Sequence, residues 1–266
     1  MIKVLVCGFF GRMGSQVVNA VCSQEDMTIV GGYDPAVLCG NVEWGGEKIA
    51  PAFGDLAQAL AETDPDVLVD FTSPASVEGN LRCALPTGVD CVVGTTGLSV
   101  ATYEGLIGLA PEGTTLFHAP NFTTGAVLMM AFAKKAACYF PDAEVIEFHH
   151  NGKKDAPSGT AVSTALSIAE ARRGAGVFTH APGKETELPD YLGARGADAD
   201  GVPVHSVRSN GYVAHQEVIF GSPGQTLTIR HDSIDRTSYM PGVLLAIREV
   251  GKRSGLIIGL ENFLGL

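Results

Sequence analysis

The sequence lacks the cysteine spacing that zinc-binding and disulfide-rich proteins carry. Its six cysteines form no CxxC motif, and several lie in apolar runs such as "VLVC" and "DCVV". Thiols in such runs behave as small buried hydrophobic side chains. We therefore expect neither a disulfide framework nor a zinc site, and we expect a reducing compartment.

Positive charge is also scarce. The chain has 18 Lys and Arg residues against 29 Asp and Glu residues, and its formal net charge is −11. This balance argues against a nucleic acid or an anionic membrane as a partner. An anionic ligand would need a local cluster of cationic groups to overcome the overall field.

Long apolar stretches are absent as well. No run reaches the roughly 18 residues that a membrane-spanning helix needs. The first residues, "MIKVLVCG", have neither the basic flank nor the cleavage site of a signal peptide. These absences predict a soluble, cytoplasmic protein without a membrane partner.

The first 120 residues alternate short apolar strands with amphipathic helices. This pattern is typical of a parallel sheet with helices on both faces, and it predicts a Rossmann-type, doubly wound α/β domain. The expected strands are 2–7, 28–33, 66–71, 90–94 and 114–119, and the expected helices are 15–24, 55–62 and 74–85.

The rest of the chain has a different pattern, which predicts a smaller α+β domain with an open mixed sheet. Its strands have short connections at Asn210-Gly211 and Ser222-Pro223-Gly224, so successive strands should be antiparallel. The expected helices are 124–140, 159–173 and 240–250, and the expected strands are 143–149, 204–209, 213–220 and 225–231, with 174–203 left unassigned. We place the first domain at 1–120, the second at 121–232 and a return to the first at 233–266.

Three glycines, Gly8, Gly11 and Gly14, follow the first expected strand directly. Glycines at such a turn let the backbone approach a pyrophosphate, whose charge is stabilised by the N–H groups at the helix start. The spacing is GxxGxxG, and Phe10 occupies the middle position of the commoner GxGxxG. The position between a strand and a helix favours a dinucleotide site, with an ordinary tight turn as the alternative.

Asp34 ends the second expected strand, about twenty residues after Gly14, where a ribose hydroxyl needs an acceptor. Its carboxylate would repel a 2′-phosphate, and Pro35 follows it instead of Arg or Lys. The pattern therefore favours NADH over NADPH, although Arg12 could still reach a phosphate. The alternative for Asp34 is an ordinary aspartate at a helix start.

Two further segments, "GTTG" (94–97) and "APNF" (119–122), follow expected strands. The carboxyl ends of parallel strands are where open α/β sheets bind their ligands. The alternative for each segment is a helix cap, formed by Thr95 or Thr96 in the first and by Thr123 in the second.

The run "EFHHNGKKDAPSGTA" (147–161) concentrates titratable groups just before an expected helix. Hydride transfer to a conjugated acceptor requires a proton donor with a pKa near neutrality and cations that hold the substrate. His149 suits the first task, and Lys153 could assist it by hydrogen bonding or charge.

The helix start that follows offers groups for an anion. The N–H groups of Gly159 and Thr160 and the Thr160 hydroxyl can grip a carboxylate, and His150 would add a donor. A small dicarboxylate that accepts hydride fits this set. If His149 and His150 both line a site, the strand must end or bend near Phe148.

Three plainer interpretations compete for this run. A metal site is disfavoured, because neighbouring strand residues point to opposite faces and no Cys or third His is suitably spaced. A solvated charged loop is the second. The third is a structural N-cap by Asp155 or Ser158, which is compatible with a functional role.

The run "EVIEFHHNGKKDAPSGTA" (144–161) resembles, without a gap, the signature of the dihydrodipicolinate reductase (4-hydroxy-tetrahydrodipicolinate reductase) family. That pattern is roughly E-x-x-E-x-H-H-x-x-x-K-x-D-x-P-S-G-T-A. The first glycine turn, "DFTSP" (70–74), "VGTTG" (93–97), "NFTTG" (121–125) and residues 205–233 are similar to the same family. The resemblance covers nearly the whole chain and is weakest over 35–54 and 174–203.

The resemblance implies NAD(P)H-dependent reduction of 4-hydroxy-tetrahydrodipicolinate to tetrahydrodipicolinate in the diaminopimelate–lysine pathway. It implies that His149 is the proton donor or acceptor and that Lys153 is a proton donor. From the spacing of Cys and His alone, we expect no metal. The implied substrate-binding residues are His150, Ser158, Gly159 and Thr160. The implied cofactor-binding residues are Gly8, Phe9, Phe10, Gly11, Arg12, Met13, Asp34, Gly94, Thr95, Thr96, Ala119, Pro120, Asn121 and Phe122.

The resemblance also implies a homotetramer assembled through the sheet of the second domain, and a hinge that closes over the substrate. The second domain would thus serve substrate binding and oligomerisation, and the first would bind the dinucleotide. Some family members carry a basic residue after the Asp34 position and use either cofactor. Pro35 here favours NADH over NADPH.

Two alternatives stay open on the sequence. Another two-domain NAD(P) oxidoreductase, of the homoserine or aspartate dehydrogenase type, would not be expected to carry the continuous HHxxxKxDxPSGT run. A non-enzymatic module that senses NAD(H) would keep the glycine turn but would have no need of the His/Lys cluster.

Overall fold

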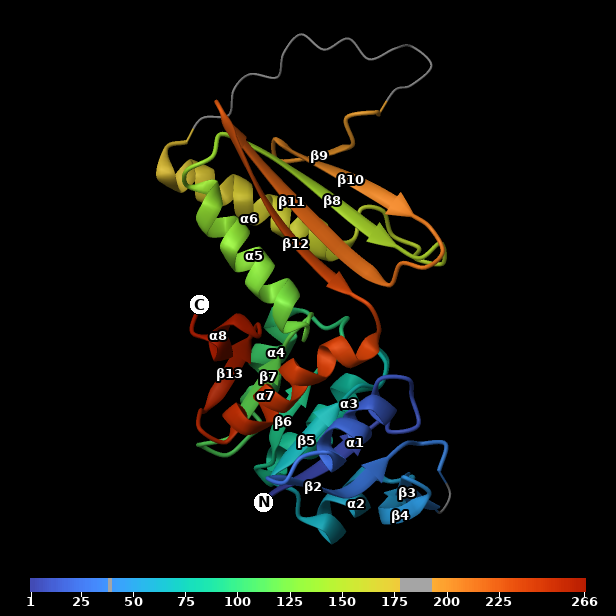
Figure 1. Ribbon diagram of the computed structural model, residues 1–266. Helices are drawn as coiled ribbons and strands as arrows, with labels where there is room; N and C mark the ends of the chain where they lie inside the picture. The colour runs from blue at the N-terminus through green and yellow to red at the C-terminus, as the bar shows by residue number, and fades with distance from the viewer. Residues whose placement is uncertain (38–39, 178–192) are drawn as a thin grey trace. The chain divides into compact units, whose positions relative to one another are not determined.

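The computed structural model describes residues 1–37, 40–177 and 193–266 (Figure 1). The chain divides into two compact units. Unit 1 comprises Met1–Thr124 and Arg236–Leu266, and unit 2 comprises Gly125–Asp235. No helix in these three ranges is both long and apolar enough to cross a membrane.

Unit 1 is built on an eight-stranded sheet with the order β13-β7-β6-β5-β1-β2-β4-β3. Its strands are β1 Ile2–Cys7, β2 Met27–Tyr33, β3 Gly40–Trp44, β4 Glu47–Phe53, β5 Val67–Asp70, β6 Asp90–Val93, β7 Thr115–His118 and β13 Gly255–Ile258. All neighbours pair in parallel except β3, which pairs antiparallel with β4 at one edge. The predicted Rossmann-type α/β fold is confirmed.

Helices cover the sheet of unit 1 and bury its apolar strands. They are α1 Gly14–Cys22, α2 Leu56–Thr63, α3 Val77–Ala84, α4 Val100–Ile107, α7 Met240–Val250 and α8 Glu261–Leu264, with short 3-10 turns η1 Leu85–Thr87 and η2 Arg236–Tyr239. Side chains of α2, α3 and α4 pack in one core with Leu5, Leu68 and Leu116 of the sheet. Helices α1 and α7 pack against each other and against the strands.

Unit 2 contains a five-stranded sheet with the order β12-β11-β8-β10-β9. Its elements are α5 Thr124–Ala137, β8 Asp142–His149, α6 Gly159–Ala175, β9 Ala197–Ala199, β10 Val202–Arg208, β11 Ala214–Ser222 and β12 Gln225–Ser233. The central strand β8 pairs in parallel with β10 and antiparallel with β11. The sheet is therefore open and mixed, as predicted.

One core holds unit 2 together on the helix-bearing side of this sheet. Ala133 and Ala137 of α5 and Ile168 of α6 pack there against Val145 of β8 and Val218 of β11. Residues of β8 alternate between buried and partly exposed, so every second side chain of β8 points toward the helices.

The two predicted turns of the second sheet have different outcomes. Strands β11 and β12 form an antiparallel hairpin that closes between Ser222 and Gln225. Strands β10 and β11 run in opposite directions but do not pair, because β8 lies between them. Arg208 of β10 and Ala214 of β11 both pair with His149, so the Asn210-Gly211 turn passes over the end of β8.

Candidate functional site

The glycine turn after β1 is tight enough to require glycine at two positions. Gly8 has φ +79°, and a Cβ atom on it would lie 2.6 Å from the Phe71 carbonyl oxygen. A Cβ atom on Gly14 would lie 2.1 Å from the Gly8 carbonyl oxygen. Helix α1 therefore begins directly against the turn, and no side chain of the described residues caps its start. Such a start suits a phosphate.

The residues within this turn face different ways. The Phe9 ring is buried, and it lies where a Cβ atom on Gly32 would meet it at 2.6 Å. Only the Phe9 backbone can therefore face a ligand. The Phe10 ring is 66% exposed, Arg12 is exposed and Met13 is half-buried.

Asp34 lies beside the glycine turn at the same edge of the sheet. The Gly8 N–H donates to the Tyr33 carbonyl oxygen at 2.8 Å, so the ends of β1 and β2 are joined there. One Asp34 carboxylate oxygen accepts from the Ala36 N–H at 3.0 Å. The structure thus brings together the two features that the dinucleotide prediction requires.

A buried carboxylate, Asp70, organises the next loops, and the sequence reasoning missed it. It ends β5 with no solvent exposure. Its Oδ1 accepts from the Thr95 hydroxyl at 2.6 Å and from the Thr72 hydroxyl at 2.8 Å, and its Oδ2 accepts from the Asn80 amide at 2.8 Å. A carboxylate at the end of the apolar strand "VLVD" is the signal that could have revealed it.

The Thr95 hydroxyl is consequently engaged in hydrogen bonds within the protein. Its hydroxyl donates to Asp70 and also accepts from the Thr72 N–H at 2.8 Å. The suggested cap by Thr95 or Thr96 is wrong, because Ser99 caps α4 and accepts from the Thr102 N–H. Thr96 is exposed and Gly94 half-buried.

The segment after β7 is mostly core. Ala119 and Phe122 are buried, and the Phe122 ring lies 5.6 Å from the Phe71 ring. Pro120 is exposed and Asn121 half-buried, and the Asn121 side-chain oxygen accepts from the following Thr123 N–H at 2.9 Å. Strands β2, β1, β5, β6 and β7 are parallel neighbours. The predicted cofactor-binding segments follow β1, β2, β6 and β7, so all of them lie at the carboxyl ends of the strands of this sheet.

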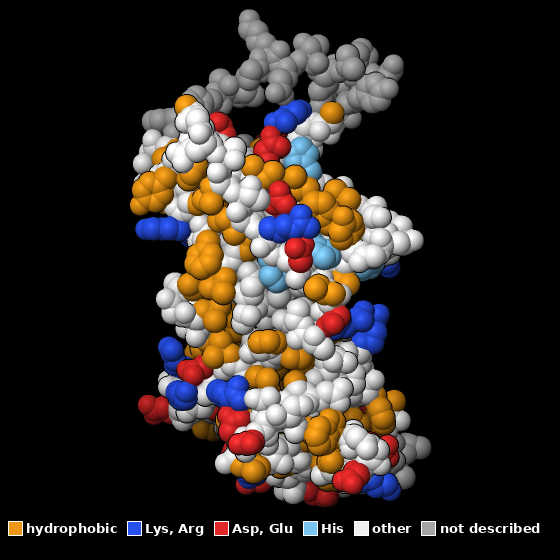
Figure 2. Space-filling view, in the orientation of Figure 1, with side chains coloured by type: hydrophobic (Ala, Val, Ile, Leu, Met, Phe, Trp, Pro, Cys, Tyr) orange, Lys and Arg blue, Asp and Glu red, His pale blue; other side chains and the backbone are white. Residues whose placement is uncertain are grey.

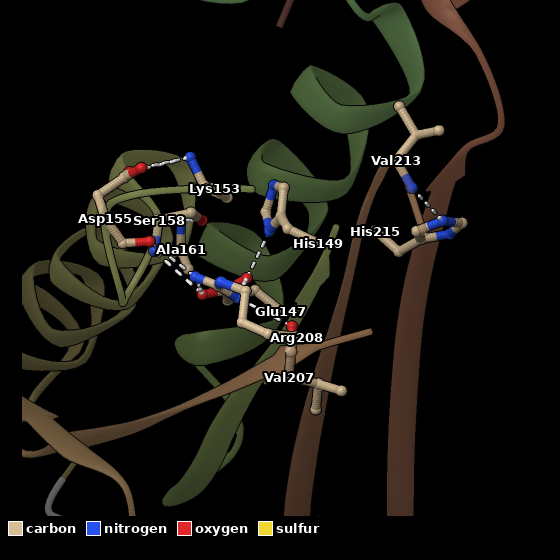
Figure 3. Close-up of polar contacts among 10 residues, drawn as sticks. All are labelled: Glu147, His149, Lys153, Asp155, Ser158, Ala161, Val207, Arg208, Val213 and His215. Atoms are coloured by element: carbon tan, nitrogen blue, oxygen red, sulfur yellow. Dashed lines mark hydrogen bonds and ion pairs between the residues drawn. The ribbon is translucent and has the colours of Figure 1, made fainter. Parts of the chain in front are cut away.

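In unit 2, a second group of polar residues gathers at the end of β8 (Figure 3). Glu147 and His149 are two residues apart and point to the same face of the strand. The His149 Nδ1 and a Glu147 oxygen are 2.5 Å apart, and the Glu147 side chain has no solvent exposure. Arg208 donates to both Glu147 oxygens at 2.8 Å.

The charge state of this group follows from its surroundings. Burial alone would raise the pKa of Glu147, but hydrogen bonds from Arg208, Ser206 and His149 outweigh it and hold that pKa below its usual range. For His149, burial is the largest influence and lowers the pKa. Glu147 opposes this effect, whereas Lys153 and Arg208 add to it, and the net result lies below the ordinary histidine value.

The loop between β8 and α6 carries Lys153 and Asp155. The Lys153 Nζ lies 2.8 and 2.9 Å from the two Asp155 oxygens. This hydrogen bond is the main reason that the pKa of Asp155 is lowered, and the Gly159 N–H contributes to the same effect. Asp155 is thus the partner of both the Lys153 ammonium and the Gly159 N–H at the start of α6.

Helix α6 begins as predicted with Ser158 as its N-cap. The Ser158 hydroxyl accepts from the Ala161 N–H at 3.2 Å, and the Ser158 N–H donates to Glu147 at 3.2 Å. Ser158 is buried, whereas nothing lies within 4 Å of a Cβ atom on Gly159. Thr160 is half-buried.

Strand β8 ends at His149, so the condition for the histidine pair is met. His150 lies exposed in the turn that follows, and its carbonyl oxygen accepts from the Lys153 N–H at 3.1 Å. Within the described ranges, no three His, Cys, Asp or Glu residues are arranged to hold a metal ion.

These features define a class: a Rossmann-type nucleotide-binding unit joined to a mixed-sheet unit with a carboxylate–histidine pair. Residues 2–122 match the sequence profile of dihydrodipicolinate reductase, N-terminus, and residues 125–264 match dihydrodipicolinate reductase, C-terminus. The chain belongs to the dihydrodipicolinate reductase family, whose members are NAD(P)H-dependent oxidoreductases. The resemblance predicted from the sequence is confirmed, and the homoserine or aspartate dehydrogenase alternative is set aside.

Individual relatives match over their full length. The 4-hydroxy-tetrahydrodipicolinate reductase of Desulfitobacterium hafniense is 47% identical over 271 residues, which cover 99% of this chain and 98% of that protein. The enzyme of the same name from Nocardia farcinica is 49% identical and covers 100% and 99%. A solved structure, dipicolinate-bound dihydrodipicolinate reductase from Paenisporosarcina sp. TG-14, superposes with a TM-score of 0.86 at 41% identity, covering 98% of this chain and 99% of that one.

Proposed function

We propose that this chain reduces 4-hydroxy-tetrahydrodipicolinate to tetrahydrodipicolinate with NAD(P)H, in the diaminopimelate–lysine biosynthetic pathway. Beyond the family membership, the observation that carries this proposal is the end of β8. There a buried carboxylate–histidine pair lies beside a lysine and a helix start. These are the groups that a hydride acceptor with carboxylates requires.

The overall reaction replaces a ring hydroxyl by hydrogen. Hydride comes from the reduced nicotinamide, one proton is taken up, and one water leaves, so that atoms and charge balance. The chain must therefore deliver a proton and stabilise negative charge that develops as hydride adds. His149 and Lys153 are the groups that we assign to this task.

The substrate carboxylates would bind at the start of α6. The open space at Gly159 leaves room for an anion next to the N–H groups of Gly159 and Thr160. His150 and the Thr160 hydroxyl would add donors. Ser158 would act mainly by fixing the helix start, since its own hydroxyl is engaged. The Paenisporosarcina relative is described as bound to dipicolinate, which is such a dicarboxylate.

Asp155 contacts the groups that we assign to the substrate carboxylate. Its carboxylate contacts the Lys153 ammonium and accepts from the Gly159 N–H. A substrate carboxylate would compete for the same two groups. The bound dianion would also raise the pKa of His149, because a nearby negative charge favours the protonated imidazole.

The cofactor would bind at the carboxyl edge of the unit 1 sheet. Its pyrophosphate would contact the turn from Gly8 to Met13, and its ribose would meet Asp34. The segments Gly94–Thr96 and Ala119–Phe122 would contact the remainder. NADH is the expected preference, because the Asp34 carboxylate disfavours a 2′-phosphate and Pro35 supplies no compensating cation.

We also propose a cytoplasmic homotetramer assembled through the outer face of the second sheet. Strand β12 is exposed along most of its length, and Figure 2 shows histidine, charged and hydrophobic side chains gathered over β11 and β12. On this face Arg230 lies over the Phe148 ring at 5.2 Å. Sedimentation equilibrium should give the mass of four chains, whereas a monomer mass would contradict this assembly.

The activity is tested by following the loss of reduced-nicotinamide absorbance with freshly generated 4-hydroxy-tetrahydrodipicolinate. We expect substrate-dependent consumption, faster with NADH than with NADPH at low cofactor concentration. Consumption that does not depend on the substrate would refute the reaction. A lower KM for NADPH than for NADH would refute the role of Asp34 in cofactor choice.

A further inference from the structure

We propose that Glu147 and Arg208 are positioning residues for His149, acting as a pair with opposite effects. Glu147 fixes the ring of His149 and favours its protonated form, and Arg208 limits that influence by sharing the same carboxylate. The inference rests on the proposed function, in which His149 supplies the proton.

The first support is the geometry around Glu147. Its fully buried carboxylate accepts from the Arg208 guanidinium, the Ser158 N–H, the Ser206 side chain and His149 Nδ1. A buried carboxylate needs a partner, and a bidentate arginine is sufficient for charge balance. The contact to His149 is not required for that balance.

The second support is the direction that this contact gives the imidazole. An Nδ1–H that donates to Glu147 leaves Nε2 as the nitrogen that can exchange a proton with a substrate. In Figure 3 the second ring nitrogen of His149 points away from Glu147. The carboxylate therefore selects both the tautomer and the orientation of the ring.

The third support is that the same carboxylate reaches the substrate grip. One Glu147 oxygen accepts from Ser158, the N-cap of α6. Arg208 extends the connection, because it also donates to the Asp155 carbonyl oxygen at 2.7 Å. The Glu147–Arg208 ion pair thus joins β8, β10 and the loop before α6. It fixes the position of His149 relative to the start of α6.

The charged groups around His149 act in opposite directions. Glu147 from β8 favours the imidazolium, whereas Arg208 from β10 and Lys153 from the loop disfavour it. Asp155 contacts the Lys153 ammonium at 2.8 Å. Strand β11 places Ala214 beside His149, and the α6 start contributes Ser158, Gly159 and Thr160, none of which titrates.

The test is the pH profile of turnover in two variants. His149 acts as an acid, so activity is present below its pKa and is lost as pH rises through that pKa. Glu147→Gln removes the group that raises the pKa, so the loss should move to lower pH, with turnover reduced about ten- to a hundredfold. Arg208→Lys keeps the charge but loses the fork on Glu147, so the loss should move to higher pH.

A folding defect would lower turnover at every pH and would leave the pH at which activity is lost unchanged. Shifts of that pH in opposite directions in Glu147→Gln and Arg208→Lys therefore indicate a positioning role. Glu144→Gln is the matched control. Glu144 lies on the same strand as Glu147, and it also contacts a histidine, His205, at 2.8 Å and an arginine, Arg195. This control should keep the wild-type profile. Displacement of both variants in one direction, or of neither, would overturn the proposal.

Nitrogen NMR of labelled histidine tests the wild type without relying on variants. The signal that disappears in His149→Gln identifies His149. We expect its neutral form to carry the proton on Nδ1. A proton on Nε2 would overturn the proposal, even if Glu147→Gln does not fold. Wild-type turnover in His149→Gln would instead refute the proposed function and leave the tautomer result standing.

Discussion

Replacing Gly14 by alanine tests the dinucleotide site through a single methyl group. The added Cβ would lie 2.1 Å from the Gly8 carbonyl oxygen, whereas ordinary contacts begin at 3.4 Å. Relief of the clash requires a separation of about 1.3 Å between α1 and the turn, the difference of those two distances. The clash is with backbone, which cannot rotate away as a side chain could.

The expected loss of stability and of NADH affinity can be estimated from the hydrogen bonds that this movement disturbs. The Gly8 carbonyl oxygen also accepts from the Gly11 N–H at 2.9 Å, so the turn itself must change. Overpacking of this kind costs about 1–3 kcal/mol in free energy of unfolding. Loss of one charge-assisted hydrogen bond to the pyrophosphate costs about 1.5–3 kcal/mol, which raises Kd about ten- to a hundredfold.

The assay combines urea unfolding with a fluorescence titration of NADH, and Gly105→Ala is the control. Gly105 is exposed in α4, where nothing lies within 4 Å of an added Cβ atom. Alanine should stabilise that helix by about 0.5–1 kcal/mol and leave the Kd for NADH unchanged. A folded Gly14→Ala variant with the wild-type Kd would refute the placement of the cofactor at this turn.

Three further predictions concern other parts of the two sites. His149→Gln and Lys153→Ala should each lower turnover by about two orders of magnitude or more with nearly unchanged NADH affinity; near-wild-type turnover in both would remove their assigned roles. Thr160→Val, which keeps the N–H and the side-chain shape, should raise the substrate KM about tenfold, and an unaltered KM would argue against the carboxylate grip. Asp70→Ala leaves the buried Thr95 hydroxyl without its acceptor and should lower the free energy of unfolding by about 1–3 kcal/mol, so wild-type urea stability would contradict its structural role.

Much of the fold could be predicted because local periodicity and local capping encode it. The apolar runs of β1, β5 and β6 are buried strands, and Ser158 opens α6 where the Ser-Gly-Thr sequence indicated. Among the described residues, strands β3, β4, β9 and β13 and helices α4 and α8 were missed. Strands β3 and β4 are exposed or half-buried over most of their length, so neither has a clear apolar pattern. Strand β13 is an apolar run of only four residues, GLII. The sequence left 174–203 unassigned, and residues 178–192 of that stretch lie outside the described residues.

The candidate site was predicted only as far as neighbours in sequence define it. His149, Lys153 and the α6 start are close along the chain, and a known reaction could be matched to them. Arg208 is 61 residues from Glu147, and the pair forms only because β10 lies beside β8. The Asn210-Gly211 turn indicated a hairpin. In the structure β8 lies between β10 and β11, and this arrangement depends on tertiary packing that no turn residue specifies.

We propose above all that His149, at the end of β8, protonates the substrate that a reduced nicotinamide supplies with hydride. The most direct test of this proposal is turnover of freshly generated 4-hydroxy-tetrahydrodipicolinate with NADH by wild type, His149→Gln and the Glu144→Gln control. We expect substrate-dependent NADH consumption in wild type and control, and turnover about a hundredfold lower in His149→Gln. No consumption by the wild type, or equal consumption by all three proteins, would contradict the proposal.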